Sequence, residues 1–198
     1  MIRIGTSGWS YPSWRPGFYP AELQPADFLG FYASRFDTVE LNSTGYRLPG
    51  EDQFKRWAEA VPDGFRFAVK LPLTRLDRVT TFLERAAWLG DRLGPVRIVV
   101  ESPRDDGLVE FVTGSAPPEM ELAWDLRDES WAGVEGIVRV DDPAAEPFRY
   151  LRLREPPYTD DELEAFAQTV RAPAYVYLSH EDDPSDPVYA EKLRALLR

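Results

Sequence analysis

Short apolar segments alternate with longer amphipathic ones along most of the chain. The short segments are rich in Val, Ile, Leu and Phe and have the length of strands, whereas the longer ones repeat apolar residues at helical spacing. The pattern predicts strands at Ile2–Thr6, Thr38–Asn42, Phe65–Leu71, Val96–Glu101, Met120–Leu126, Gly136–Val140, Phe148–Arg154 and Ala174–Ser179. It predicts helices at Pro25–Phe36, Glu51–Val61, Thr80–Gly94, Asp106–Gly114, Asp161–Arg171 and Asp186–Leu197.

This alternation predicts an α/β fold with a parallel sheet and helices outside it. Eight strands favour a trimmed (β/α)8 TIM-type barrel, since the usual barrel has ~250 residues and this chain has 198. The segments "RDESWAG" and "DDPAAEP" are too short for full helices, so we expect short or missing helices after the fifth and sixth strands. No linker-like tract divides the sequence, which indicates a single domain over residues 1–198. An open doubly wound sheet is the alternative.

The amino-acid composition limits the kinds of site and partner that the chain can have. The chain has no cysteine and a single histidine, His180, which excludes thiolate metal sites and sites built from several imidazoles. No dense carboxylate motif points to a metal site, and the sequence specifies no cofactor. The net charge of −11 disfavours nucleic acid as a partner. No run of ~18 apolar residues occurs, and "MIRIGTSG" is too short and polar for a signal peptide, so we expect a cytoplasmic protein without membrane contact.

Polar side chains gather where the predicted strands end, which is where the sites of barrel enzymes lie. They are Ser7, Glu40, Asn42, Lys70, Asp125, Arg127, Arg152 and His180. Residues i and i+2 of a strand share a face, so Glu40 and Asn42 face the interior if Val39 and Leu41 face the helices. A carboxylate there needs a cationic partner. The cluster is either a structural ion-pair network or a ligand pocket with Glu40 and Asp125 as acid–base candidates.

The loop "GTSGWSYPSWRPGFYP" carries more aromatic area than a turn needs. Because it follows the first strand, its rings either cap the barrel mouth as a small core or wall a cleft for bases or sugars. We expect Trp9 and Phe18 to be mostly buried, and Tyr11 and Trp14 to face a ligand. Three residues after the second and fifth strands would extend the same rim: Tyr46, Arg47 and Trp131.

Four segments in order, "IRIGTSGWSYPSW…FYP", "VELNSTGYRLP", "FRFAVKLP" and "AWDLRDESW", resemble the YecE-like family, domain of unknown function 72. The resemblance implies a TIM-barrel-like fold and no securely established activity. The family's motifs fall on Gly5, Ser7, Gly8, Trp9, Tyr11, Trp14, Glu40, Asn42, Tyr46, Arg47, Lys70, Asp125, Arg127, Ser130, Trp131 and Arg152. Asp125 stands where the family usually has Glu, and Arg154 and Glu155 replace a His-Gly pair, so a histidine that could act as a general base is absent.

Three functions fit these observations, and the sequence leaves open whether the protein is an enzyme. The first is a polar, aromatic-rimmed pocket that binds or acts on a polar ligand, phosphorylated or nucleotide-like, with cationic side chains holding its anionic groups. The second is a non-catalytic module for single-stranded or damaged nucleic acid. The third is a degenerate structural relative without activity.

Overall fold

The computed structural model describes residues 1–45, 48–179 and 184–197, and these contain eight strands and six α-helices. The strands are β1 (Ile2–Thr6), β2 (Thr38–Leu41), β3 (Arg66–Pro72), β4 (Leu93–Val100), β5 (Leu122–Leu126), β6 (Val138–Arg139), β7 (Arg149–Leu153) and β8 (Ala174–Leu178). The helices are α1 (Phe28–Arg35), α2 (Glu51–Glu59), α3 (Val79–Ala86), α4 (Asp106–Ser115), α5 (Asp160–Thr169) and α6 (Ser185–Leu196).

Several predicted boundaries shift by a few residues, and the largest difference concerns the third predicted helix. The helix expected over Thr80–Gly94 ends as an α-helix at Ala86 and continues as a 3-10 helix over Ala87–Arg92. Gly90 has a φ of 55°, a left-handed conformation that favours glycine and interrupts the helical geometry. Strand β4 therefore begins at Leu93, three residues before the predicted start.

The strands form two sheets in which every neighbouring pair is parallel. The orders are β1-β8-β7 and β2-β3-β4-β5-β6. Two single parallel bridges join the sheets, one between Ser7 and Glu40 and one between Val140 and Tyr150. The first bridge lies beside Gly5, where a Cβ would meet the Thr38 carbonyl oxygen at 2.1 Å. Strand β1 can approach β2 this closely only because Gly5 has no side chain.

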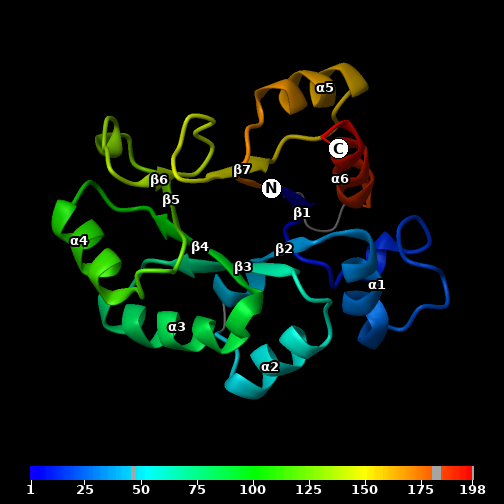
Figure 1. Cartoon of the computed structure of the whole chain (residues 1–198), viewed down its shortest axis with the longest axis horizontal. Helices are drawn as coiled ribbons and strands as arrows, with labels where there is room; N and C mark the ends of the chain where they lie inside the picture. Colours follow the sequence, from blue (N-terminus) through cyan, green and yellow to red (C-terminus); the bar gives the residue numbers. More distant parts are fainter. Residues whose placement is uncertain (46–47, 180–183, 198) are drawn as a thin grey trace.

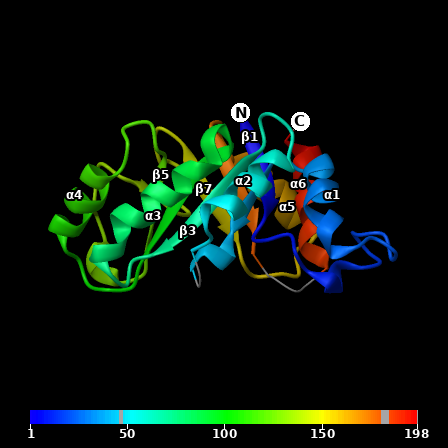
Figure 2. The same cartoon turned by 90° about the horizontal axis from the view of Figure 1, so that it is seen from below.

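The helices form a ring around the strands in Figure 1, with one gap. From α4 to α5 the ring is occupied by loops around β5 and β6. Between β5 and β7, where every residue is described, only the 3-10 helix Glu129–Trp131 follows β5, and no α-helix is present. Figure 2 shows both termini on one side of the molecule. Because β1 starts at the N-terminus and its neighbours are parallel to it, the carboxyl ends of the strands lie on the opposite side.

Strand alternation separates two hydrophobic clusters. The larger cluster packs the outward-facing strand residues, such as Val39 and Leu41, against the helices. The smaller one holds residues from the opposite strand faces, among them Ala68, Ala123 and Tyr177. Small alanines leave room inside for long polar side chains from neighbouring strands. Among the described helices, none combines the length and the apolar character needed to cross a lipid bilayer.

Candidate functional site

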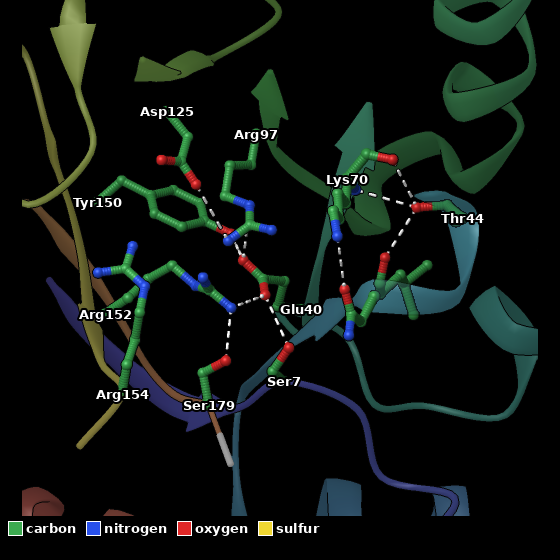
Figure 3. A network of polar contacts seen from close by, with 12 residues as sticks. Ser7, Glu40, Thr44, Lys70, Arg97, Asp125, Tyr150, Arg152, Arg154 and Ser179 are labelled. Atoms are coloured by element: carbon green, nitrogen blue, oxygen red, sulfur yellow. Dashed lines mark hydrogen bonds and ion pairs between the residues drawn. The ribbon is translucent and has the colours of Figure 1, made fainter. Parts of the chain in front are cut away.

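A buried carboxylate, Glu40, is the centre of a polar network inside the strands (Figure 3). Its side chain is fully buried on β2, between the outward-facing Val39 and Leu41. Oε1 accepts a hydrogen bond from the Ser7 hydroxyl at 2.8 Å and from Arg152 Nη2 at 3.0 Å. Oε2 accepts one from the Tyr150 hydroxyl at 2.5 Å. The interior orientation predicted for Glu40 is therefore confirmed by its contacts.

The charge of Glu40 is stabilised in the folded protein. Burial alone would raise the pKa of its carboxyl, but the positive charges of Arg97 and Arg152, together with the hydrogen bonds from Tyr150 and Ser7, outweigh burial and lower the pKa to about 2. Burial and the neighbouring Glu40 raise the pKa of Tyr150 well above its ordinary value, so this phenol stays a neutral hydrogen-bond donor. At neutral pH Glu40 is ionised and has no proton to donate, and its low pKa makes it a weak base.

Arg97 on β4 is a residue of this polar network that sequence reasoning missed. Its side chain is 2% exposed, and its Nε lies 3.3 Å from Glu40 Oε2 while its Nη1 lies 3.5 Å from Asp125 Oδ2. Arg97 thus bridges the carboxylates of β2 and β5. A signal was present, because a single arginine between Val96 and Ile98 in an otherwise apolar strand must face a polar interior.

Asp125 and Arg127 extend the network toward the carboxyl end of β5. Arg127 Nη2 donates to Asp125 Oδ2 at 2.8 Å, as expected for residues that share a strand face. The side chain of Asp125 is 7% exposed and that of Arg127 is 46% exposed. Arg127 is therefore an arginine of the network that solvent reaches readily.

Strand β7 and the residue after it contribute two further arginines, Arg152 and Arg154. Arg152 Nη2 donates to Ser179 Oγ at 2.6 Å as well as to Glu40, which links β7 to the end of β8. The backbone N–H of Arg152 donates to Asp141 Oδ1 at 2.7 Å, and Asp141 Oδ2 accepts a hydrogen bond from Arg154 Nη1. The replacement of the histidine expected at Arg154 thus adds a positive charge rather than a titratable base.

Lys70 and Asn42 lie at the ends of β3 and β2. Lys70 Nζ donates to Asn42 Oδ1 at 3.2 Å, and both side chains are half-buried. The Thr44 hydroxyl lies within hydrogen-bond distance of the Leu41 and Lys70 carbonyl oxygens, and it accepts a hydrogen bond from the Lys70 backbone N–H at 3.0 Å. The structure thus brings the predicted Asn42 and Lys70 together through a direct contact.

We call these groups the strand-end network: Ser7, Glu40, Asn42, Lys70, Arg97, Asp125, Arg127, Asp141, Tyr150, Arg152, Arg154 and Ser179. Among these described residues, five side chains are cationic and three are carboxylates. The strand-end network therefore carries an excess of two positive charges in a chain whose net charge is −11. Its cations are concentrated on the side where the strands end.

Two tryptophans expected to contact a ligand are part of the core instead. Trp14 is completely buried, with its ring 5.9 Å from Tyr19 and 5.8 Å from Phe18. Trp131 is also completely buried, and its Nε1 donates to the Ser102 carbonyl oxygen at 2.8 Å. The exposure expected of these two rings is wrong, because Trp14 packs against neighbouring rings and Trp131 lies within the larger hydrophobic cluster. The predicted burial of Trp9 and Phe18 is confirmed.

A groove of about 1260 Å³ opens beside the network, between α1 and α2. Three of the predicted ligand-binding residues line it: Trp9, Tyr11 and Asn42. Trp9 is 9% exposed and meets the ring of Trp57 edge-on at 5.3 Å, while Tyr11 is half-buried and its hydroxyl donates to the Ser7 carbonyl oxygen. Because Asn42 also binds Lys70, it belongs to both the groove and the strand-end network.

Three predicted residues, Tyr46, Arg47 and His180, lie outside the described residues. Within the described part of the chain, no group of three or more His, Cys, Asp or Glu side chains is arranged to hold a metal ion. The carboxylates of the strand-end network face arginines rather than one another, which is a poor environment for a cation.

Known relatives share this sequence pattern. The family described as "Protein of unknown function DUF72" matches residues 3–140. UPF0759 protein YecE of Escherichia coli (strain K12) is 38% identical over 140 residues, which cover 64% of this chain and 48% of YecE. UPF0759 protein YunF of Bacillus subtilis (strain 168) is 31% identical over 70 residues, covering 35% of this chain and 24% of YunF. The chain spans about half the length of YecE.

Solved structures show the same fold. A DUF72 family protein from Thermotoga maritima has a TM-score of 0.78 at 22% identity, covering 100% of this chain and 99% of that one. Another from Enterococcus faecalis has a TM-score of 0.75 at 16% identity, covering 100% and 97%. Phosphoribosyl anthranilate isomerase from Thermotoga maritima, a TIM-barrel-like neighbour, has a TM-score of 0.51 at 14% identity, covering 100% and 98%. The match over residues 3–140 and the identity to YecE show that this chain belongs to the DUF72 family.

Proposed function

We propose that the strand-end network binds the anionic group of a small polar ligand, such as a phosphorylated compound. The observation that carries the proposal is the excess of two positive charges in a chain of net charge −11. A phosphate monoester carries about −1.5 to −2 charges at pH 7, which matches that excess. Planar guanidinium groups also suit its oxygens, because they donate two parallel hydrogen bonds.

The proposal also covers the fold that carries the site. We propose that the two sheets form one domain, a trimmed (β/α)8 barrel closed by the Ser7–Glu40 and Val140–Tyr150 bridges. The parallel pairing throughout, the ring of helices and the TIM-barrel-like neighbours support closure. In such a barrel the carboxyl ends of the strands form the binding face.

Within the proposed site, Glu40 holds arginines in place and does not transfer protons. Glu40 has four polar partners and a pKa of about 2, so its role is to position Arg97 and Arg152. Asp125 positions Arg127 in the same way, and it keeps its place as the candidate acid–base group because it is closer to solvent. Arg127 and Arg154 are the network arginines that solvent reaches, with side chains 46% and 32% exposed.

The groove between α1 and α2 would take the uncharged part of the ligand. It adjoins the network at Asn42 and offers aromatic surface from Trp9, Tyr11 and Trp57. Binding sites for small molecules are commonly concave and mostly apolar, with a few convergent polar groups. A sugar or base ring against these side chains would direct its anionic group toward the strand-end network.

Thermal unfolding with a panel of anions tests this function. We expect inorganic phosphate, a sugar phosphate or a mononucleotide to raise Tm by about 5 to 10 °C at 100 times its Kd. Arg127→Gln should reduce the shift. Arg171→Gln should not, because Arg171 is exposed and lies three residues before the start of β8, at the opposite end of the strands.

The remaining outcomes separate the alternatives. A shift given only by short single-stranded oligonucleotides, and lost steeply with added salt, would replace this proposal by a nucleic-acid-binding module. Equal shifts in wild type, Arg127→Gln and Arg171→Gln would show that anions bind elsewhere. No shift from any anion would leave a structural ion-pair network and overturn the proposal.

A further inference from the structure

A cavity of about 360 Å³ lies beside β7, outside the groove described above. It is lined by Asp141, Pro143, Leu151, Arg152, Arg154 and Phe166, among others. The segment that follows β6 forms one wall and α5 another, at the seam where the Val140–Tyr150 bridge joins the two sheets. No α-helix follows β6 in this fully described segment. No helix from this segment therefore packs over Arg152 or Arg154.

Asp141 contacts the side chain of Arg154 and the backbone of Arg152. Its Oδ2 accepts a hydrogen bond from Arg154 Nη1, and its Oδ1 accepts one from the Arg152 backbone N–H at 2.7 Å. Its own backbone N–H donates to the Tyr150 carbonyl oxygen at 2.9 Å. Asp141 has a φ of 66°, the one non-glycine residue with positive φ among the described residues. The backbone is thus bent so that the carboxylate faces β7.

The arginines are incompletely satisfied by these contacts. Arg152 Nε and Arg154 Nε are buried and have no hydrogen-bond partner among the described residues. The Arg154 side chain is 32% exposed and that of Asp141 is 38% exposed, so their ion pair is within reach of solvent and is weak enough to exchange. The Asp141 carboxylate supplies one negative charge and two acceptor oxygens, fewer than the N–H donors of these two guanidinium groups could use.

We propose that this cavity is the phosphoryl subsite of the protein and that Asp141 occupies it as a built-in competitor. An incoming phosphate monoester displaces the Asp141 carboxylate from Arg154 and brings more negative charge and a third acceptor oxygen to Arg152 and Arg154. Apolar side chains of the cavity wall, Leu151 and Phe166, exclude water around the new contact. This inference rests on the proposed function, because it assigns the anion of that function to one place in the network.

Two substitutions with opposite expected effects test the subsite. Asp141→Asn removes the competing charge, while asparagine keeps the side-chain oxygen and tolerates a positive φ. We expect it to tighten the binding of inorganic phosphate roughly two- to fivefold, the value of a partly exposed ion pair. Arg154→Gln should weaken binding about tenfold or more, because a charged hydrogen bond is lost. Isothermal titration calorimetry in phosphate-free buffer measures both.

Glu146→Gln is the matched control for Asp141→Asn. It removes the same charge from the same β6–β7 segment, but Glu146 pairs with Arg149 at the start of β7, away from the cavity. Equal affinities in Asp141→Asn and Glu146→Gln, or weaker binding in Asp141→Asn, would overturn the competitor role. Thermal unfolding of each variant confirms that it is folded.

The design also separates this inference from the proposed function. If Arg127→Gln abolishes phosphate binding while Arg154→Gln leaves it unchanged, the strand-end network binds anions but the cavity is not the subsite. If neither wild type nor Asp141→Asn binds phosphate, both the subsite and the anion-binding function are wrong. Stronger binding in Asp141→Asn together with weaker binding in Arg154→Gln supports both.

Discussion

At the scale of single residues, the molecule depends on a few buried charges that compensate one another. Glu40 is fully buried and stays ionised because Arg97 and Arg152 lie against it. The same carboxylate orders both guanidinium groups, since without it each would be a buried charge with fewer partners. The low pKa of Glu40 and its two arginine partners therefore make it a counter-ion rather than an acid or a base.

Replacing Glu40 should destabilise the fold. In Glu40→Gln the buried Arg97 and Arg152 lose their shared counter-charge, and we expect the free energy of unfolding to fall by about 3 to 5 kcal/mol. Urea denaturation measures this fall, with the exposed Glu155→Gln as the control that should stay near wild type. A loss of less than about 0.5 kcal/mol for Glu40→Gln would show that the network does not need this charge.

The same carboxylate should make stability depend on pH. Its pKa lies near 2 in the folded protein against an ordinary value of 4.5, so its stabilisation is fully present above pH 4.5 and disappears as the pH falls through about 2. The difference in unfolding free energy between wild type and Glu40→Gln should thus shrink over that range, by on the order of 3 kcal/mol. A difference that stays constant over the same range would mean that the carboxyl pKa is not depressed.

At the scale of elements, the sequence pattern predicts which face of a strand a residue lies on better than it predicts whether an aromatic ring is exposed to solvent. The alternation of Val39, Glu40 and Leu41 places Glu40 inside from sequence alone, and the order of strands and helices follows from hydrophobic spacing. The exposure of Trp14 could not be predicted, because it depends on packing against Tyr19 and Phe18 within a loop of irregular backbone. Whether β1 pairs with β2, and β6 with β7, to join the two sheets also depends on tertiary contacts.

Trp14 should behave as a core residue. We expect Trp14→Ala to lower the free energy of unfolding by about 3 to 5 kcal/mol, because it leaves a large cavity among aromatic rings. Thermal or urea denaturation checks this, with Phe111→Ala as a control at a side chain that is 45% exposed. Wild-type stability combined with lost ligand binding would instead restore Trp14 as a binding residue.

The seam between β1 and β2 should be intolerant of any side chain at Gly5. Gly5→Ala would place a Cβ against the Thr38 backbone, and we expect a loss of at least about 1 to 3 kcal/mol. Gly30→Ala on α1 is the matched control, because its Cβ would meet nothing within 4 Å and alanine favours a helix by about 0.5 to 1 kcal/mol. Similar effects of the two substitutions would contradict the close approach of the two strands.

At the scale of the whole molecule, no α-helix lies between β5 and β7, a segment in which every residue is described. Arg152 and Arg154 border a cavity there rather than a helix that follows β6. The fold was predictable because parallel α/β units have strong periodic signals. The position of Asp141 was not, because it depends on the bend after a two-residue strand.

The central claim is that phosphate binds at the strand-end arginines, and nitrogen-15 NMR of arginine side chains during a phosphate titration tests it most directly. We expect the Nε–Hε resonances of Arg127, Arg152 and Arg154 to move in a saturable way, with those of Arg35 and Arg171 unchanged. Individual Arg→Lys substitutions assign the signals. Uniform small shifts of every arginine, or no shift at the strand-end arginines, would contradict the account.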